Sequence, residues 1–175
     1  GSYPSRPDRC EYMKALAKAK THGERMKYRL KLLNLGTDVL DYLEECASAP
    51  QVEVRKAVIG VLKETHALRA KKMLLDRLKF DSSDAVRYKS AEALSRFKGD
   101  ETVEALVEAL DDPSEKVRLC ACVALKTLLG HVPGAENGQK NGISGSRNLM
   151  MDSEQLDRQV QAWVTWWKEE HEQLV

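Results

Sequence analysis

The sequence predicts an all-α protein, folded as a right-handed α-solenoid of about four helical hairpins with a C-terminal capping helix. The first supporting observation is a segment that recurs three times and ends each time in a Val-Arg pair, at Val54–Arg55, Val86–Arg87 and Val117–Arg118. These pairs lie 32 and 31 residues apart, a period typical of stacked helical repeats. The second observation is the composition. With 31% charged and 6% aromatic residues, it favours an array of solvated helices over a β-sandwich.

Each of the three clear repeats is predicted to consist of a helix, a short turn and a second helix. The first helices are expected at residues 37–47, 68–80 and 100–110, and the second helices at 50–64, 82–97 and 113–129. An earlier pair of helices, at 8–20 and 22–35, is interpreted as a divergent first repeat. The second helix of that pair has an apolar stripe of Met26, Leu30 and Leu33. The predicted hairpins therefore span residues 8–129 and divide into 8–35, 36–66, 67–98 and 99–129.

The residues at the predicted turns support these boundaries. Asp112, Pro113 and Glu115 have the spacing of an N-cap, a first-turn proline and a capping-box acid. Asp152 and Gln155 have the capping-box spacing at the start of the last predicted helix. A glycine is favoured where a helix ends in a left-handed residue. Such glycines follow the second helices at Gly36, Gly99 and Gly130.

The remaining segments are assigned by composition. Residues 1–7 are expected to be a tag or linker, and residues 130–151, rich in Gly, Asn and Ser, a flexible loop. Residues 152–175 are predicted to form a capping helix, because a terminal repeat exposes an apolar face that must be covered. Trp163 and Trp167 lie on the apolar stripe of this helix and are expected to make that contact.

The distribution of charge and the cysteine content indicate which classes of partner, and which cell compartment, are expected for this protein. Residues 1–100 carry 21 basic and 14 acidic side chains, a charge of +7, and residues 101–175 carry 7 and 13, a charge of −6. No apolar run is long enough to cross a membrane, and no membrane partner is expected. The four cysteines are interpreted as small buried core residues, which indicates a cytoplasmic or another reducing intracellular compartment. Cys120 and Cys122 point about 200° apart on a helix, so no shared metal site is expected.

Two repeats share a longer pattern, in which an Asp is followed after four residues by Val-Arg and then by Ala-Leu. It is found at Asp81, Val86–Arg87 and Ala93–Leu94, and again at Asp112, Val117–Arg118 and Ala124–Leu125. This pattern resembles the HEAT-repeat family of armadillo-like helical proteins, in particular its phycobilisome-lyase-like variety. The resemblance implies a structural ladder of Asp and Arg side chains between adjacent repeats, formed here by Asp81, Arg87, Asp112 and Arg118. Because Ala49 and Thr21 stand at the Asp position of the earlier repeats, the ladder is expected only between the last two.

The resemblance also implies that the outward side of the second helices lines a concave face. Helical phase places the Val of each pair and the side chains four, seven, eight and eleven positions after it in the core. The side chains at the second, sixth and ninth positions after the Val lie on the outward side. The outward residues form the candidate partner-binding set of Tyr28, Leu32, Lys56, Lys63, Tyr88, Glu92, Leu119, Val123 and Lys126. This set is more apolar than a merely solvated face, and tyrosine is enriched in protein interfaces.

The function expected from these observations is a non-catalytic protein–protein interaction scaffold, a monomeric module of a larger chain with an unidentified protein partner. No catalytic residue and no cofactor are expected, since the chain has no phosphate-binding loop, no Ser-His-Asp order and no Cys-His pair. One alternative is nucleic-acid binding by the basic N-terminal half. A second, which rests on the resemblance alone, is a bilin-lyase-like enzyme. A third possibility is that the loop or a neighbouring domain covers the outward face.

Overall fold

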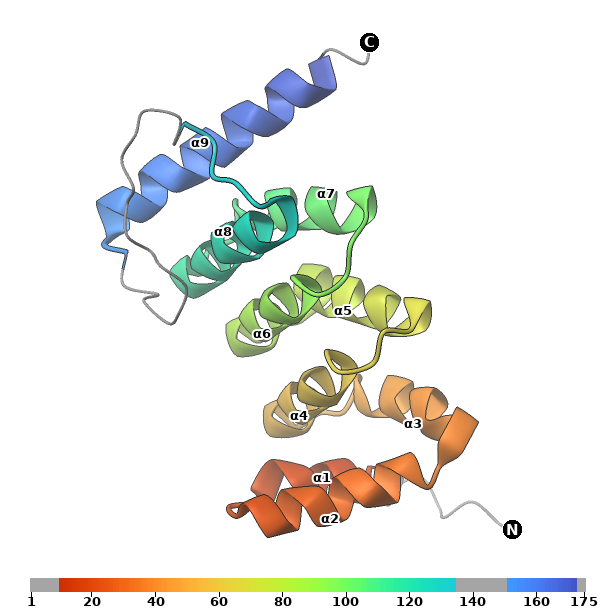
Figure 1. Cartoon of the computed structure of the whole chain (residues 1–175). Helices are drawn as coiled ribbons and strands as arrows, with labels where there is room; N and C mark the ends of the chain where they lie inside the picture. Colours follow the sequence, from red (N-terminus) through yellow and green to blue (C-terminus); the bar gives the residue numbers. More distant parts are fainter. Residues whose placement is uncertain (1–9, 135–150, 173–175) are drawn as a thin grey trace.

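The computed structural model describes residues 10–134 and 151–172. These residues form α-helices, the 3-10 helix η2 (Gly36–Asp38) and no strand, so the predicted all-α class is confirmed. The helices are α1 (Glu11–Lys18), α2 (His22–Leu33), α3 (Val39–Cys46), α4 (Val52–Leu62), α5 (Leu68–Phe80), α6 (Asp84–Leu94), α7 (Asp100–Ala109), α8 (Glu115–Leu129) and α9 (Ser153–Glu172). Figure 1 shows the hairpins stacked along one axis, with α1 and α2 at one end and α9 at the other. This stack is the predicted α-solenoid, and its right-handedness stays a prediction.

The three central hairpins form two layers of helices. The first helices α3, α5 and α7 pack along one layer, and the second helices α4, α6 and α8 pack along the other. The core between the layers is built from the stripe that follows each Val-Arg pair, and Val86, Leu94 and Leu125 are fully buried there. The helical phase of these second helices therefore agrees with the sequence pattern.

The second helices begin two residues later than predicted, at Val52, Asp84 and Glu115. Before α6 and α8 the reason is a local turn, in which the backbone N–H groups of Ser83 and Ser114 donate to the carboxylates of Asp81 and Asp112, each at 2.9 Å. A short side chain that bonds to the backbone two residues ahead competes with helix formation. Asp112 is therefore not the N-cap of α8, and the predicted capping box with Glu115 is wrong. The N-cap is Ser114, whose side chain makes no capping hydrogen bond.

The N-terminal hairpin differs from the prediction, because α1 rather than α2 packs against α4. Helix α2 packs on α1 and lies at the end of the stack, as Figure 1 shows. Its predicted apolar stripe is wrong: Met26, Leu30 and Leu33 are exposed, while Leu32, expected on the outward face, is 3% exposed. The physical reason is that α1 carries the better core face, with Met13 fully buried, and so takes the place beside α4.

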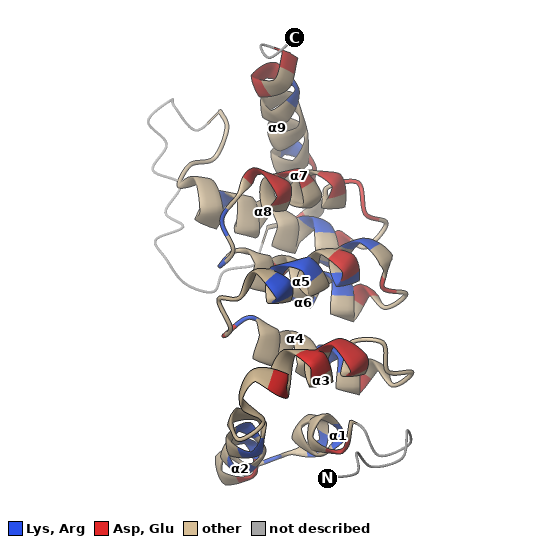
Figure 2. Ribbon diagram, turned by 90° about the vertical axis from the view of Figure 1, so that its right-hand side faces the viewer, with Lys and Arg blue, Asp and Glu red and all other residues tan. Residues whose placement is uncertain are grey.

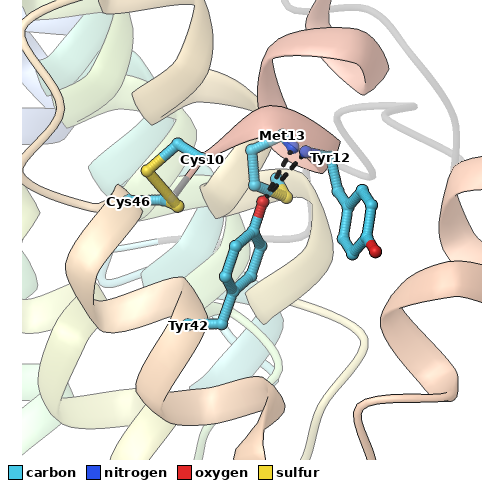
Figure 3. The surroundings of a disulfide bond; sticks show 5 residues. All are labelled: Cys10, Tyr12, Met13, Tyr42 and Cys46. Carbon is cyan, nitrogen blue, oxygen red and sulfur yellow. Dashed lines mark hydrogen bonds between the residues drawn. A yellow bond between two sulfur atoms is a disulfide. The ribbon is translucent and has the colours of Figure 1, made fainter. Parts of the chain in front are cut away.

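A disulfide joins Cys10, at the start of α1, to Cys46, the last residue of α3, with a Cα–Cα distance of 5.6 Å. In Figure 3 the Tyr42 hydroxyl lies beside this bond, where it accepts hydrogen bonds from the backbone N–H groups of Tyr12 and Met13 at 3.0 and 3.3 Å. The expectation of four reduced cysteines is therefore wrong for this pair. Since disulfides are typical of oxidising surroundings, the reducing compartment inferred from those cysteines no longer follows.

At the other end, α9 packs on α7 and α8 and buries Leu156 and Trp163. The predicted capping box is present, because Asp152 and Gln155 exchange hydrogen bonds between side chain and backbone. Most of the predicted loop at 130–151, and the predicted tag or linker at 1–7, lie outside the described residues. Within the described ranges, no helix is both long and apolar enough to span a bilayer.

Candidate protein-binding face

Two arginine–aspartate pairs fix the turns that orient the second helices. Arg87 donates from Nε and Nη2 to the two carboxylate oxygens of Asp112 at 2.9 and 3.2 Å. Arg55 makes the same bidentate contact with Asp81, at 3.0 and 3.1 Å. The ladder thus reaches one repeat further than expected, since Arg55 reaches forward to the Asp of the following repeat and needs no Asp at Ala49.

Each ladder arginine also binds the turn before its own helix. Arg55, Arg87 and Arg118 donate from Nη1 to the backbone carbonyl six residues earlier, at 2.9, 3.0 and 2.8 Å. Among the described residues, Arg118 has no aspartate partner and donates only to the carbonyls of Asp112 and Pro113. The same arginine contacts therefore hold the three turns, and α4, α6 and α8 start in equivalent geometry.

Seven of the nine candidate partner-binding residues lie on α4, α6 and α8 or at the end of α4. We call this set the second-helix face: Lys56, Lys63, Tyr88, Glu92, Leu119, Val123 and Lys126. Val123 is 40% exposed and Glu92 is exposed, whereas Tyr88 and Leu119 are half-buried against the edge of the core. The ammonium of Lys116 lies 5.6 Å from the centre of the Tyr88 ring, a cation–π contact that sequence reasoning missed.

The other two candidates, Tyr28 and Leu32, lie on α2 and do not join this face. Leu32 is buried in the core. Tyr28 is half-buried, with the Lys27 and Lys31 ammonium groups 5.6 and 5.3 Å from its ring centre. Because α2 does not occupy the place next to α4, the row expected across four repeats covers only three.

Ion pairs run across the opposite face, formed by the first helices. Figure 2 views that side and shows acidic residues on α3 and α7 and basic residues on α5. Arg69 pairs with Asp41 and Glu44 of α3. Toward α7, Lys71 and Lys79 lie 3.9 and 4.0 Å from Glu101 and Glu108. We call this set of seven the first-helix face; much of its charge is paired between neighbouring helices.

The second-helix face is different, because in the described part of the chain no ion pair crosses it from one helix to the next. Its one pair, Lys56 with Glu53, lies within α4. Apolar and aromatic atoms of Tyr88, Leu119 and Val123 therefore sit among charges that have not been neutralised by the neighbouring repeat.

The basic residues of the N-terminal half, which the nucleic-acid alternative requires, do not form one stripe. Lys27 and Lys31 lie on α2, at the end of the stack, and Lys71 and Lys79 lie on α5, on the first-helix face. Several already have acidic partners, such as Arg29 with Glu64 at 3.0 Å. Phosphate backbones are bound by clustered cations, so this distribution does not favour a nucleic-acid groove.

The free thiols are poor nucleophiles. Burial raises the pKa of Cys120 to about 11, with a smaller contribution from the negative charge of Glu92, and burial alone raises the pKa of Cys122 to about 12. Both thiols are therefore protonated at neutral pH, and only the thiolate is reactive. The described residues also contain no group of three or more His, Cys, Asp or Glu side chains placed to hold a metal ion.

Comparison with known proteins gives one family. Residues 72–135 match the family described as HEAT repeats. No curated protein matches the chain. The matched segment contains most of α5, all of α6, α7 and α8, and the Arg87–Asp112 pair.

Proposed function

We propose that this chain, in which residues 72–135 match the HEAT-repeat family, binds a protein partner on the second-helix face, since HEAT repeats generally act as protein-interaction scaffolds. The chain would be a non-catalytic scaffold module that functions as a monomeric part of a larger chain. Its partner would contact α4, α6 and α8 together, because these helices lie side by side.

The observation that carries the proposal is the contrast between the two faces. On the first-helix face, charged side chains of neighbouring repeats pair with one another. On the second-helix face, Tyr88, Leu119 and the exposed Val123 offer apolar surface without such pairing. Partially exposed aromatic and aliphatic side chains ringed by polar ones are characteristic of interface centres.

The test uses a variant that changes this face without touching the core. Tyr88 and Leu119 are half-buried, so their truncation would also destabilise the fold. Val123→Asp combined with Glu92→Lys changes only exposed positions. Partner proteins that the immobilised wild-type protein retains on a column are identified by cross-linking and mass spectrometry. We expect the double variant to keep the circular dichroism spectrum of a helical protein but no longer to retain these partners. The matched control is Leu68→Asp, at a site 79% exposed at the start of α5.

Nucleic-acid binding predicts a different result. Lys56→Ala with Lys63→Ala would then abolish binding to labelled DNA or RNA, and the affinity would fall steeply with added salt because bound counterions are released. Such binding at near-physiological ionic strength, unaffected by the Val123 and Glu92 changes, would overturn the protein-partner proposal.

A further inference from the structure

A groove runs between α5 and α7 on the side of the molecule opposite the second-helix face. We call it the α5–α7 groove; its volume is about 490 Å³. Its floor is aliphatic, formed by Leu75 and Ala105 with the buried Leu78 beneath. At one end stands Phe80, the last residue of α5, whose side chain is 68% exposed. A large aromatic side chain left this open beside an apolar floor is typical of a docking surface.

The walls of the groove carry mainly negative charge. Glu101, Glu104 and Glu108 recur on one side of α7, at the spacing that places helical residues above one another, and Asp76 faces them from α5. The α5 side contributes one ammonium, that of Lys79, 4.0 Å from Glu108.

The ion pairs occupy only the two ends of the groove. Lys71 reaches Glu101 at one end, and Lys79 reaches Glu108 at the other. Between them, Asp76 and Glu104 have no basic partner among the described residues, and both side chains are exposed. The middle of the groove is thus an aliphatic floor flanked by two carboxylates that lack a counter-charge.

We propose that the α5–α7 groove binds a basic segment of a partner protein, in which arginine or lysine residues alternate with aliphatic ones. A guanidinium or ammonium between Asp76 and Glu104 supplies the missing charge, and arginine can bind a carboxylate through two donors. The aliphatic side chains of the segment cover Leu75 and Phe80. This surface is separate from the second-helix face, so its binding does not depend on the function proposed above.

The probe is a fluorescently labelled synthetic peptide of alternating arginine and leucine, titrated with the whole chain and followed by anisotropy. Two comparison peptides replace arginine by glutamate or leucine by serine. We expect binding of the Arg-Leu peptide only, with an affinity that Phe80→Ala and Glu104→Lys each lower by about tenfold or more. Both positions are exposed, so the melting temperature of each variant should remain that of the wild type.

Matched controls use exposed residues of the same types outside the groove. Leu68→Ala removes an exposed aliphatic side chain from the same helix as Phe80, and Glu92→Lys reverses an exposed glutamate on the second-helix face. Neither should change the affinity for the peptide, and neither should Val123→Asp. Equal loss with Glu92→Lys would show non-specific attraction and overturn the proposal. So would equal binding of the Arg-Ser peptide, or loss with Val123→Asp.

Discussion

At the scale of single residues, the two ladder pairs differ in how far they are removed from water. The side chains of Arg55 and Asp81 are 9% and 1% exposed, whereas those of Arg87 and Asp112 are 15% and 11% exposed. Asp81 also accepts from Arg77, at 3.4 Å, and from the backbone N–H of Ser83, at 2.9 Å. The loss of a carboxylate costs more where the arginine left behind is less hydrated.

We therefore predict that Asp81→Ala destabilises the protein by about 3–5 kcal/mol, the range for breaking a buried ion pair. Asp112→Ala should cost less, roughly 1–3 kcal/mol, because its arginine is closer to water. Guanidinium unfolding monitored by circular dichroism measures both. Asp111→Ala, at an exposed neighbouring aspartate, is the control and should change the free energy of unfolding by less than about 0.5 kcal/mol. A larger loss for Asp112→Ala than for Asp81→Ala would contradict the role of burial.

At the scale of helices, α9 covers the last hairpin mainly through one tryptophan. Trp163 is fully buried and packs against Trp166 in an edge-to-face arrangement, with ring centres 5.5 Å apart. Trp167, which was expected to share the capping role, is half-buried, and the centre of its ring lies 3.5 Å from the centre of the His171 ring. The Trp163 indole N–H has no hydrogen-bond partner in the described part of the chain. Among these residues, Trp163 therefore stabilises the docking of α9 by apolar packing.

Trp163→Ala should cost about 3–5 kcal/mol, as deletions of buried aromatic side chains do. Trp163→Phe should cost clearly less, because it keeps an aromatic ring in the core and sacrifices no hydrogen bond to the described residues. Trp167→Ala and Trp166→Ala serve as half-buried comparisons and should each cost less than Trp163→Ala. Urea unfolding is followed by circular dichroism, because each variant lacks a tryptophan and its fluorescence signal therefore differs from that of the wild type. Equal, small effects for all three alanine variants would mean that α9 is not docked through Trp163.

At the scale of the whole molecule, stability should be uneven along the stack. The central hairpins pack on neighbours on both sides, whereas α2 packs mainly on α1, and α1 reaches the array mainly through α4. The Cys10–Cys46 disulfide adds a covalent connection from α1 to α3. In a repeat protein each unit is stabilised mainly by its neighbours, so the N-terminal hairpin depends on this connection more than any central hairpin does.

Reduction of the disulfide by a thiol reagent should therefore lower the free energy of unfolding by about 2–4 kcal/mol, as expected for a loop of this length. Hydrogen–deuterium exchange should accelerate in α1 and α2 and remain slow in α6 and α8. The Cys10→Ser, Cys46→Ser protein is the control, because the reagent should not change its exchange. Uniform acceleration along the chain, or a wild-type protein that contains no Cys10–Cys46 linkage by peptide mapping, would contradict the prediction.

Much of the fold could be predicted because its signals are local. The Val-Arg pairs and the apolar stripe after each of them place Val86, Leu94 and Leu125 in the core, since helical periodicity depends only on residues a few positions apart. The candidate face on α4, α6 and α8 follows from the same phase. Its binding role remains a prediction, as do the repeat boundaries.

The sequence by itself determined the repeat period, the helices of the three central hairpins and their buried stripes. Only the tertiary structure decided which helix of the first hairpin packs on α4, and with it the burial of Leu32 and the exposure of Met26. It also decided the Cys10–Cys46 bond and the placement of Phe80 beside the α7 carboxylates. The physical reason is that these features depend on contacts between residues far apart in the chain, and an amphipathic pattern specifies that a face is buried without specifying its neighbour.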